Sequence, residues 1–496
     1  MKFIQLFIFL IVSLVATVQA QHPNWQNKDL TADSIFGIST EKAYAELLNH
    51  KKVKKPVVVA VLDGGVDTAH EDLVSVIWKN PKEKYDGLDD DHNGYVDDVH
   101  GWDFIGGAKG DVNQDNLEIT RIVRQHQADS VKSDSIKIME KELHAKLEEA
   151  KGIVSGMSAF RTVLDTVVFK MGTKNPTITD FQNYTPSNGM ETQVKMIVLQ
   201  QLGTDPDYEK FISGLDQAID HYQTSAEYQL NMDFDPRYIV GDDYNNINQR
   251  YYGNSDVKGP KAEHATHVSG IIAAVRNNGI GINGIADHVQ IMSVRVVPDG
   301  DERDKDIANG IRYAVDNGAK VINMSFGKPY SPGKATIDEA VKYAMSKDVL
   351  MVQGSGNDGK NLDSVKSYPN PVYADGSGVA AAWINVGATG EKDDSTLIAN
   401  FSNYGKTTVD VFAPGVQIYS SVPGNKYDYY DGTSMASPVV AGLAALIREY
   451  YPKLTAVQVK DIIMRSVVKR DILKDKSISG GVVNAYNALL LAQHYK

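Results

Sequence analysis

A continuous apolar run at residues 57–62, bounded by Pro56 and by Gly64, constrains the fold more than any other feature of this sequence. A run with no polar face is typical of a central parallel strand that is buried on both sides. Strands that alternate with helices predict an α/β fold with right-handed crossovers. That alternation continues along the chain, with expected strands at 291–297, 320–324 and 349–353 and expected helices at 304–317, 335–347, 455–468 and 484–493.

Asp63 directly follows the apolar run. Open α/β sheets place their binding and catalytic groups at the carboxyl ends of strands. Taken alone, such an aspartate is more often a turn residue ahead of a glycine. Two later residues favour a catalytic role. His264 opens a run of small and apolar residues, and Ser434 precedes another, with Pro438 in its first turn, where a missing amide is tolerated.

Asp63, His264 and Ser434 supply the groups of a nucleophilic triad. A serine hydroxyl needs an imidazole to take its proton and a buried carboxylate to fix the tautomer of that imidazole. The free amide of Ser434 at a helix start would bind the oxyanion. Considered singly, Ser434 is more often a helix cap than a nucleophile. His264 with His267 is a candidate metal pair, although no nearby glutamate completes a metalloprotease pattern.

Three motifs resemble those of the subtilisin-like serine peptidases: VLDGGVD at 61–67, HATHVSG at 264–270 and GTSMASP at 432–438. The order Asp, His, Ser is also that of this family. The resemblance implies a subtilisin-like three-layer sandwich with a mostly parallel central sheet. It also implies a serine endopeptidase that forms an acyl-enzyme on Ser434. The alternative is a catalytically weak or inactive peptide-binding protein of the same fold.

The same resemblance assigns further residues. The segment 349–359 is similar to the oxyanion segment of the family, which makes Asn357 the expected side-chain donor. Two segments are similar to the family's substrate-binding walls, where an extended peptide would add as a strand. The expected substrate-binding residues are Ser325, Phe326, Gly327, Gly354, Ser355 and Gly356. Ala265 departs from the family pattern, which usually has glycine there, and would place a Cβ next to the site.

The long separation of Asp63 from His264 predicts an inserted helical subdomain at residues 105–237. Apolar residues recur there at helical spacing, most clearly from Tyr208 to Tyr222 after the capping sequence TDP at 204–206. The expected peptidase domain is therefore split into 53–104 and 238–496. The insertion is either a lid over the cleft or a packing elaboration.

Residues 1–20 predict a cleavable secretory signal, because a charged start precedes an apolar stretch and a small-residue cleavage site at Ala20. The chain has no cysteine and so no thiol for a lipid anchor. We expect a secreted or periplasmic protein with no membrane association after signal cleavage. A short extension at 21–52 follows, too short for the family's usual folded propeptide, so no large autoprocessing step is expected.

The net charge of −12 argues against nucleic acid as a partner. Polypeptide substrates are the expected partners, and the oligomeric state is open. The chemistry of a serine triad needs no cofactor. An acidic loop does predict a structural Ca²⁺ site, because oxygen ligands alternate around a glycine turn, although His100 stands where a bidentate glutamate is usual. A solvated acidic turn is the alternative. The expected ligands are Asp89, Asp91, Asn93, Tyr95 through its carbonyl, and Asp97.

Overall fold

A computed structural model describes residues 23–53 and 55–495. The predicted signal segment 1–20 lies outside the described residues. The chain divides into two compact units, one of Gln21–Asn113 with Pro236–Lys496, and the other containing Gln114–Asp235. We call them the sheet unit and the helical unit. The helical unit falls inside the limits 105–237 expected from the sequence.

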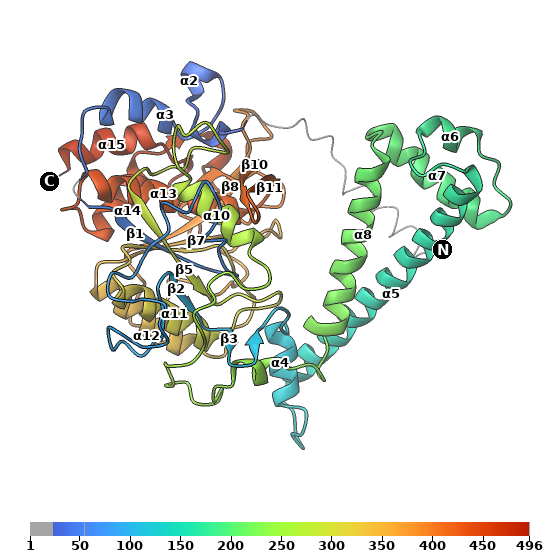
Figure 1. Cartoon of the computed structure of the whole chain (residues 1–496), viewed down its shortest axis with the longest axis horizontal. Coiled ribbons are helices and arrows are strands. Elements are labelled where there is room, and N and C mark those ends of the chain that lie inside the picture. The colour runs from blue at the N-terminus through green and yellow to red at the C-terminus, as the bar shows by residue number, and fades with distance from the viewer. Residues whose placement is uncertain (1–22, 54, 496) are drawn as a thin grey trace. The chain divides into compact units, whose positions relative to one another are not determined.

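The sheet unit is built on a nine-stranded sheet with the order β12-β13-β9-β8-β7-β6-β1-β5-β2 (Figure 1). Its strand pairs are parallel except β12 with β13. The chain first adds strands on one side of β1 and then crosses to add β6 onward on the other. The strand bounds are β1 Val57–Asp63, β2 Gly101–Asp103, β5 Val289–Arg295, β6 Val321–Met324, β7 Leu350–Gly354, β8 Trp383–Thr389, β9 Val411–Pro414, β12 Val468–Lys469 and β13 Gly481–Val482.

β1 is covered on both faces, as its uninterrupted apolar sequence predicts. Val59 and Val61 point into one hydrophobic cluster, whereas Ala60 and Leu62 point into another. Helices α10 and α13 belong to the first cluster, and α11 and α12 to the second, so helices cover both faces of the sheet. The predicted α/β sandwich is therefore confirmed.

The helices and smaller elements of the sheet unit complete these layers. The main helices are α10 Glu263–Ala273, α11 Asp304–Asp316, α12 Lys334–Ser346, α13 Thr433–Tyr450, α14 Ala456–Arg465 and α15 Ala485–His494. Short elements are η1 Trp25–Asn27, α2 Leu30–Asp33, α3 Thr40–Ala43, η2 Tyr44–Leu48, α9 Arg237–Val240, η4 Asp471–Leu473 and the hairpin strands β3 Gly106–Gly107, β4 Gly110–Asp111, β10 Ile418–Val422 and β11 Lys426–Tyr430.

The N-terminal extension is part of the sheet unit. Trp25 and Ile38 are fully buried in the same hydrophobic cluster as α13. The indole of Trp25 donates to the carbonyl of Gln417, and the amide of Ala485 donates to the carbonyl of Ile38. Residues far apart in the sequence therefore hold this segment against the body of the sheet unit.

The helical unit has a core of its own. Long helices α5 Asp134–Met171, α7 Gly189–Thr204 and α8 Tyr208–Thr224 carry it, together with α4 Glu118–Gln125, α6 Ile178–Asn183 and η3 Ser225–Gln229. Phe160, Leu164, Val198 and Leu215 are buried in that core. By length and composition α5 would suffice to cross a membrane. However, its apolar stripe packs on α7 and α8, and Arg161 on the same helix pairs with Asp216 at 2.9 Å, which is ordinary for a water-exposed bundle.

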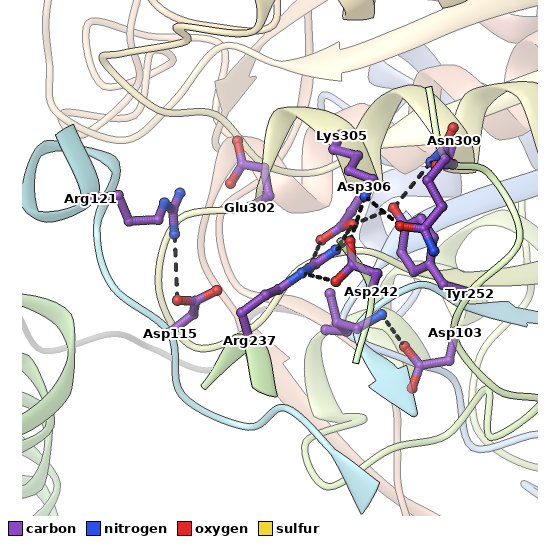
Figure 2. A network of polar contacts seen from close by, with 12 residues as sticks. Asp103, Asp115, Arg121, Arg237, Asp242, Tyr252, Glu302, Lys305, Asp306 and Asn309 are labelled. Carbon is purple, nitrogen blue, oxygen red and sulfur yellow. Dashed lines mark hydrogen bonds and ion pairs between the residues drawn. The ribbon is translucent and has the colours of Figure 1, made fainter. Parts of the chain in front are cut away.

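Four charged side chains form a buried network in the sheet unit (Figure 2). Asp306 accepts hydrogen bonds from two nitrogens of Arg237, at 2.6 and 2.8 Å, and from the hydroxyl of Tyr252 at 2.6 Å. Asp242 accepts from the same Arg237 and, at 2.6 Å, from Lys305. Two cations thus face two anions, and the network links α9 to α11.

Candidate active site

Asp63 and His264 form the best-defined contact at the carboxyl edge of the sheet. Asp63 closes β1 and is 3% exposed, and one of its oxygens accepts the amide of Gly64 at 2.7 Å. His264 lies in the first turn of α10 with its Nδ1 at 2.9 Å from both carboxylate oxygens of Asp63. An ionised carboxylate only accepts hydrogen bonds, so Nδ1 carries the proton and Nε2 presents a lone pair.

The electrostatics of His264 follow from that contact. Burial acts to lower the pKa of the imidazole, but the negative charge of Asp63 and the hydrogen bond to it outweigh this effect and raise the pKa above its ordinary 6.5. The side chain is nevertheless 42% exposed at its outer edge. The ring is therefore held by a buried carboxylate on one side and open to an incoming group on the other.

Ser434 lies in the first turn of α13, which packs against α10 on the same face of the sheet. Its hydroxyl donates to the backbone carbonyl of Ser325 at 3.1 Å. Among the described residues no hydrogen bond joins this hydroxyl to His264. The carboxyl ends of β1 and β6, which are neighbours in the sheet, thus meet the N-terminal ends of α10 and α13, and the topology gathers all three predicted triad residues at one edge.

Asn357 follows β7 in a loop beside Ser434. Its Oδ1 accepts from the backbone amide of Thr433 at 2.9 Å and from the hydroxyl of Thr433 at 3.0 Å, which leaves Nδ2 as a donor facing outward. A Cβ built on Gly432 would lie 3.5 Å from Asn357 Nδ2 and 3.5 Å from the amide nitrogen of Ser434. Two hydrogen-bond donors therefore border one small space, which a side chain at Gly432 would enter.

The predicted substrate-binding residues after β6 differ in the groups that they contact. The hydroxyl of Ser325 donates to the carbonyl of Ser434 at 2.9 Å, so Ser325 contacts the nucleophile segment through both its side chain and its backbone. A Cβ on Gly327 would lie 3.1 Å from the hydroxyl of Ser367. Phe326 is half-buried and packs against the second hydrophobic cluster.

The predicted segment after β7 is tightly packed. A Cβ on Gly354 would lie 2.9 Å from the carbonyl of Thr433, and one on Gly356 would lie 2.5 Å from Asn403 Nδ2, so neither position accepts a side chain. Ser355 is buried and donates to the carbonyl of Asn403 at 3.0 Å. Gly354 and Ser355 border a cavity of about 620 Å³. Other lining residues include Gln353, Ser367, Tyr368 and Pro369.

His267 does not join His264 in a metal site. It is fully buried, and its Nε2 donates to the carbonyls of Ile418 and Asp428 at 2.9 and 3.1 Å. Its ring stacks on Tyr430 with centroids 4.3 Å apart. Burial lowers the pKa of His267 to about 3, so the ring is neutral. Ala265, which departs from the family pattern, points its Cβ into the hydrophobic core rather than toward the cleft.

In the acidic loop, two of the five predicted calcium ligands come together with a third residue that the sequence did not single out. Oxygens of Glu83, Asp89 and Asp91 lie within 4.8 Å of one another. Glu83 is 7% exposed, and its Oε2 is buried without a hydrogen-bond partner. An unpartnered buried carboxylate oxygen fits a cation ligand. The spacing of the loop alone gave no signal for Glu83.

Two other predicted calcium ligands, Asn93 and Asp97, accept backbone amides of the loop. Asp97 has a φ of 58°, and its carboxylate turns back to accept the amides of Asp86 and Gly87 at 3.0 Å. The side-chain oxygen of Asn93 accepts the amide of Tyr95 at 2.8 Å. Side chains of this loop, Asp89 and Asp91 included, thus also fix its turns by accepting backbone amides.

Comparison with known proteins completes the description. The sequence model of the Subtilase family matches residues 54–486. A thermophilic serine proteinase of Bacillus sp. (strain AK1) is 40% identical over 242 residues, 49% of this chain and 54% of that protein. Subtilisin BL of Lederbergia lenta is 39% identical over 229 residues, which cover 46% of this chain and 75% of that protein. Alkaline elastase YaB of Bacillus sp. (strain YaB) is 37% identical over 223 residues, which cover 45% of this chain and 54% of that protein. The chain thus spans about half the length of two of these relatives.

Proposed function

Because the chain belongs to the subtilase family, we propose that it is a secreted serine endopeptidase that cleaves polypeptides through an acyl-enzyme on Ser434. The observation that carries the proposal is the contact of His264 Nδ1 with both oxygens of buried Asp63 at 2.9 Å. That contact fixes the tautomer in which Nε2 can accept a proton.

In the proposed reaction His264 is first the base and then the acid. Ser434 rotates away from the Ser325 carbonyl, Nε2 of His264 takes its proton, and Oγ attacks the peptide carbonyl carbon. The imidazolium then gives that proton to the leaving amine as the C–N bond breaks. Water, deprotonated by Nε2, attacks the acyl-enzyme, and the proton returns to Oγ as the acid product leaves. The charge of Asp63 stabilises the imidazolium at both stages.

We assign the oxyanion to the space bordered by Asn357 Nδ2 and the Ser434 amide. Both donors are fixed before substrate binds, because Thr433 holds the amide group of Asn357 by two hydrogen bonds. Donors that need no reorganisation stabilise developing charge most effectively. Removing the Nδ2 donor would leave the backbone amide alone to meet that charge.

We propose that the substrate lies as an extended strand along Ser325, Phe326 and Gly327, with one side chain entering the cavity beside Gly354 and Ser355. Gly356 keeps the loop close to Asn403 and so sets the position of Asn357. Subtilases need no cofactor for this chemistry. Profiling the cleavage of a mixed peptide library would identify the side chains that this cavity prefers.

We further propose that Glu83, Asp89 and Asp91 hold a structural Ca²⁺, with Asn93, Tyr95 and Asp97 shaping the loop around it. The unpartnered oxygen of Glu83 supports this assignment. The cation would supply charge balance among three carboxylates that otherwise repel one another. Residues 1–20 are proposed to direct export and to be removed, which gives a secreted or periplasmic protein.

A labelling experiment tests the proposed function. The mature protein should react with a fluorophosphonate probe and hydrolyse a mixed peptide library, and Ser434→Ala should abolish both. Ser346→Ala, at an exposed serine on α12, is the matched control and should behave like wild type. An unlabelled protein that still binds peptides would instead identify an inactive peptide-binding member of the fold.

A further inference from the structure

The last turn of α13 carries a carboxylate that the proposed reaction does not use. Glu449 is 4% exposed, and among the described residues neither of its oxygens makes a hydrogen bond of normal geometry, although Asp287 and the backbone of His288 lie nearby. Nearly all buried polar groups in proteins are paired, and an unpaired buried carboxylate is among the costliest exceptions. A ligand for this side chain would remove that cost.

Two further metal-binding side chains lie next to Glu449, where the chain enters β5. One ligand atom from each of Asp287, His288 and Glu449 lies within 4.8 Å of the others. His288 Nδ1 is 3.0 Å from an oxygen of Asp287. Neither carboxylate has a lysine or arginine partner in the part of the chain that the structure describes.

The nearest positive charge on this side is already engaged. Arg276 pairs with Glu41 at 2.9 Å, and its guanidinium lies 4.0 Å from the ring centre of Tyr44. The hydroxyl of Tyr44 donates to the carbonyl of Ile285 at 3.2 Å. Among the described residues, His288 is therefore the group placed to balance the charge of these two carboxylates.

From this geometry we propose that Asp287, His288 and Glu449 bind Zn²⁺. One imidazole nitrogen and two carboxylate oxygens match the mixed ligands of zinc, whereas calcium takes six to eight oxygens. Ligand atoms at about 2.0–2.1 Å from zinc lie roughly 3.3 Å from one another in a tetrahedron. The three ligand atoms, now within 4.8 Å of one another, would therefore move closer when zinc binds. Glu449 is the fixed buried anchor. His288 is exposed and Asp287 half-buried, so these two can move.

The surroundings suit such a site. The hydroxyl of Tyr450 lies 3.3 and 3.4 Å from the two oxygens of Asp287 and would orient that ligand. The exposed edge at His288 gives an entry path and leaves the fourth position for water. Three protein ligands with an open position are common for zinc.

The site is remote from the chemistry. Glu449 follows Ser434 by fifteen residues on the same helix, which corresponds to about 22 Å at 1.5 Å per residue. Zinc here would fasten the end of α13 to the start of β5. Its effect would be on stability and would leave peptide hydrolysis unchanged.

A proton is the competing occupant. Burial, reinforced by the charge of Asp287, raises the pKa of Glu449 well above its usual range when no cation is present. Asp287 and Glu449 would then share that proton. The two occupants predict different responses to added metal and to removal of the charge of Glu449.

The test uses the mature protein with Ser434→Ala, which prevents self-cleavage, freed of metal by a chelator. Addition of ZnCl₂ should give one calorimetric binding event and raise the thermal midpoint. Glu449→Gln, an isosteric change, and His288→Ala should each weaken zinc binding at least about tenfold. His126→Ala, which removes an imidazole 2.8 Å from Asp129 that has no third ligand, is the control and should leave zinc binding unchanged.

Three results would overturn the proposal. One is the absence of a saturable zinc event in the parent protein. Another is zinc binding by Glu449→Gln with parental affinity, which would assign the pocket to a proton. The third is an equal loss of zinc affinity in His126→Ala, which would indicate that zinc binds surface histidines without a specific site. CaCl₂ is tested separately. Its effect on the thermal midpoint should be lost in an Asp89 variant and kept in Glu449→Gln.

Discussion

The buried network of Arg237, Asp242, Lys305 and Asp306 gives a prediction whose size follows from its charges. Asp306→Asn keeps the shape and one acceptor oxygen but leaves two buried cations against one anion. Arg237→Met leaves two anions against one cation. Breaking a buried ion pair in this way costs about 3–5 kcal/mol, because the remaining charge is neither solvated nor paired.

The double variant Arg237→Met with Asp306→Asn should cost less than the sum of the two single variants. Lys305 and Asp242 remain a balanced pair at 2.6 Å in that protein. We expect a coupling free energy of about 2–3 kcal/mol, at the upper end for residues in one network. At about 2 °C per kcal/mol for a large domain, each single variant should lower the thermal midpoint by roughly 6–10 °C.

The assay is thermal and urea unfolding of the parent, the two single variants and the double variant. All four carry Ser434→Ala, so that self-cleavage does not distort the transition. Additive effects of the two substitutions would refute the reasoning, because they would mean that the charges act independently. Lys342→Met is the control. Its ion pair with Asp375 is largely exposed and screened by water, so its loss should leave the thermal midpoint nearly unchanged.

Acid should weaken the same network. Burial acts to raise the pKa of Asp242, but its bonds to Arg237 and Lys305 outweigh burial and lower the pKa below its ordinary 3.8. A lowered pKa means that the carboxylate stabilises the folded state fully above that ordinary value and loses this contribution as the pH falls through the folded pKa. Asp242→Asn should flatten the acid limb of the stability curve below about pH 4, as followed by urea unfolding.

Three further predictions concern the proposed enzyme. The acid limb of kcat/KM against pH should have its midpoint above 6.5, because His264 must be neutral to accept a proton and its pKa is raised, chiefly by Asp63 acting against burial; a midpoint below 6.5 would contradict this. Asn357→Ala should lower kcat by about 10²–10³ with little change in KM, which is the magnitude known for such a donor in subtilisin. An equal rise in KM would instead indicate a binding role. Replacing Gln114–Asp235 by a short linker should leave a folded sheet unit, since β4 and α9, which flank the insertion, contact each other; circular dichroism would detect loss of fold, and an unchanged cleavage profile would exclude a lid.

The sheet and its crossovers were predictable because their signal is local. A strand buried on both faces needs an unbroken apolar run, and 57–62 has one. The expected helices at 304–317 and 335–347 lie within a residue of α11 and α12. In the helical unit the sequence predicted helical spacing without clear boundaries, and the longest helix, α5, spans Asp134–Met171.

Candidate residues for the site could be proposed from the sequence, whereas most of their contacts could not. Motif and position identified Asp63, His264, Ser434 and Asn357. Neither motif nor position indicated that Thr433 orients Asn357, or that the Ser434 hydroxyl donates to Ser325. The calcium pattern named Asp97, but the backbone turns its carboxylate toward the amides of Asp86 and Gly87.

Side-chain type and apolar periodicity are properties of neighbouring positions, so the candidate catalytic residues and the main strands and helices could be predicted from the sequence. Which distant groups meet depends on how the folded layers pack. Glu83 joins Asp89 and Asp91, and Glu449 joins Asp287 and His288, through chain reversals that no spacing encodes. The physical reason is that a contact between remote side chains depends on the packing of whole layers, and the free energy of that packing is distributed over residues that never touch the site.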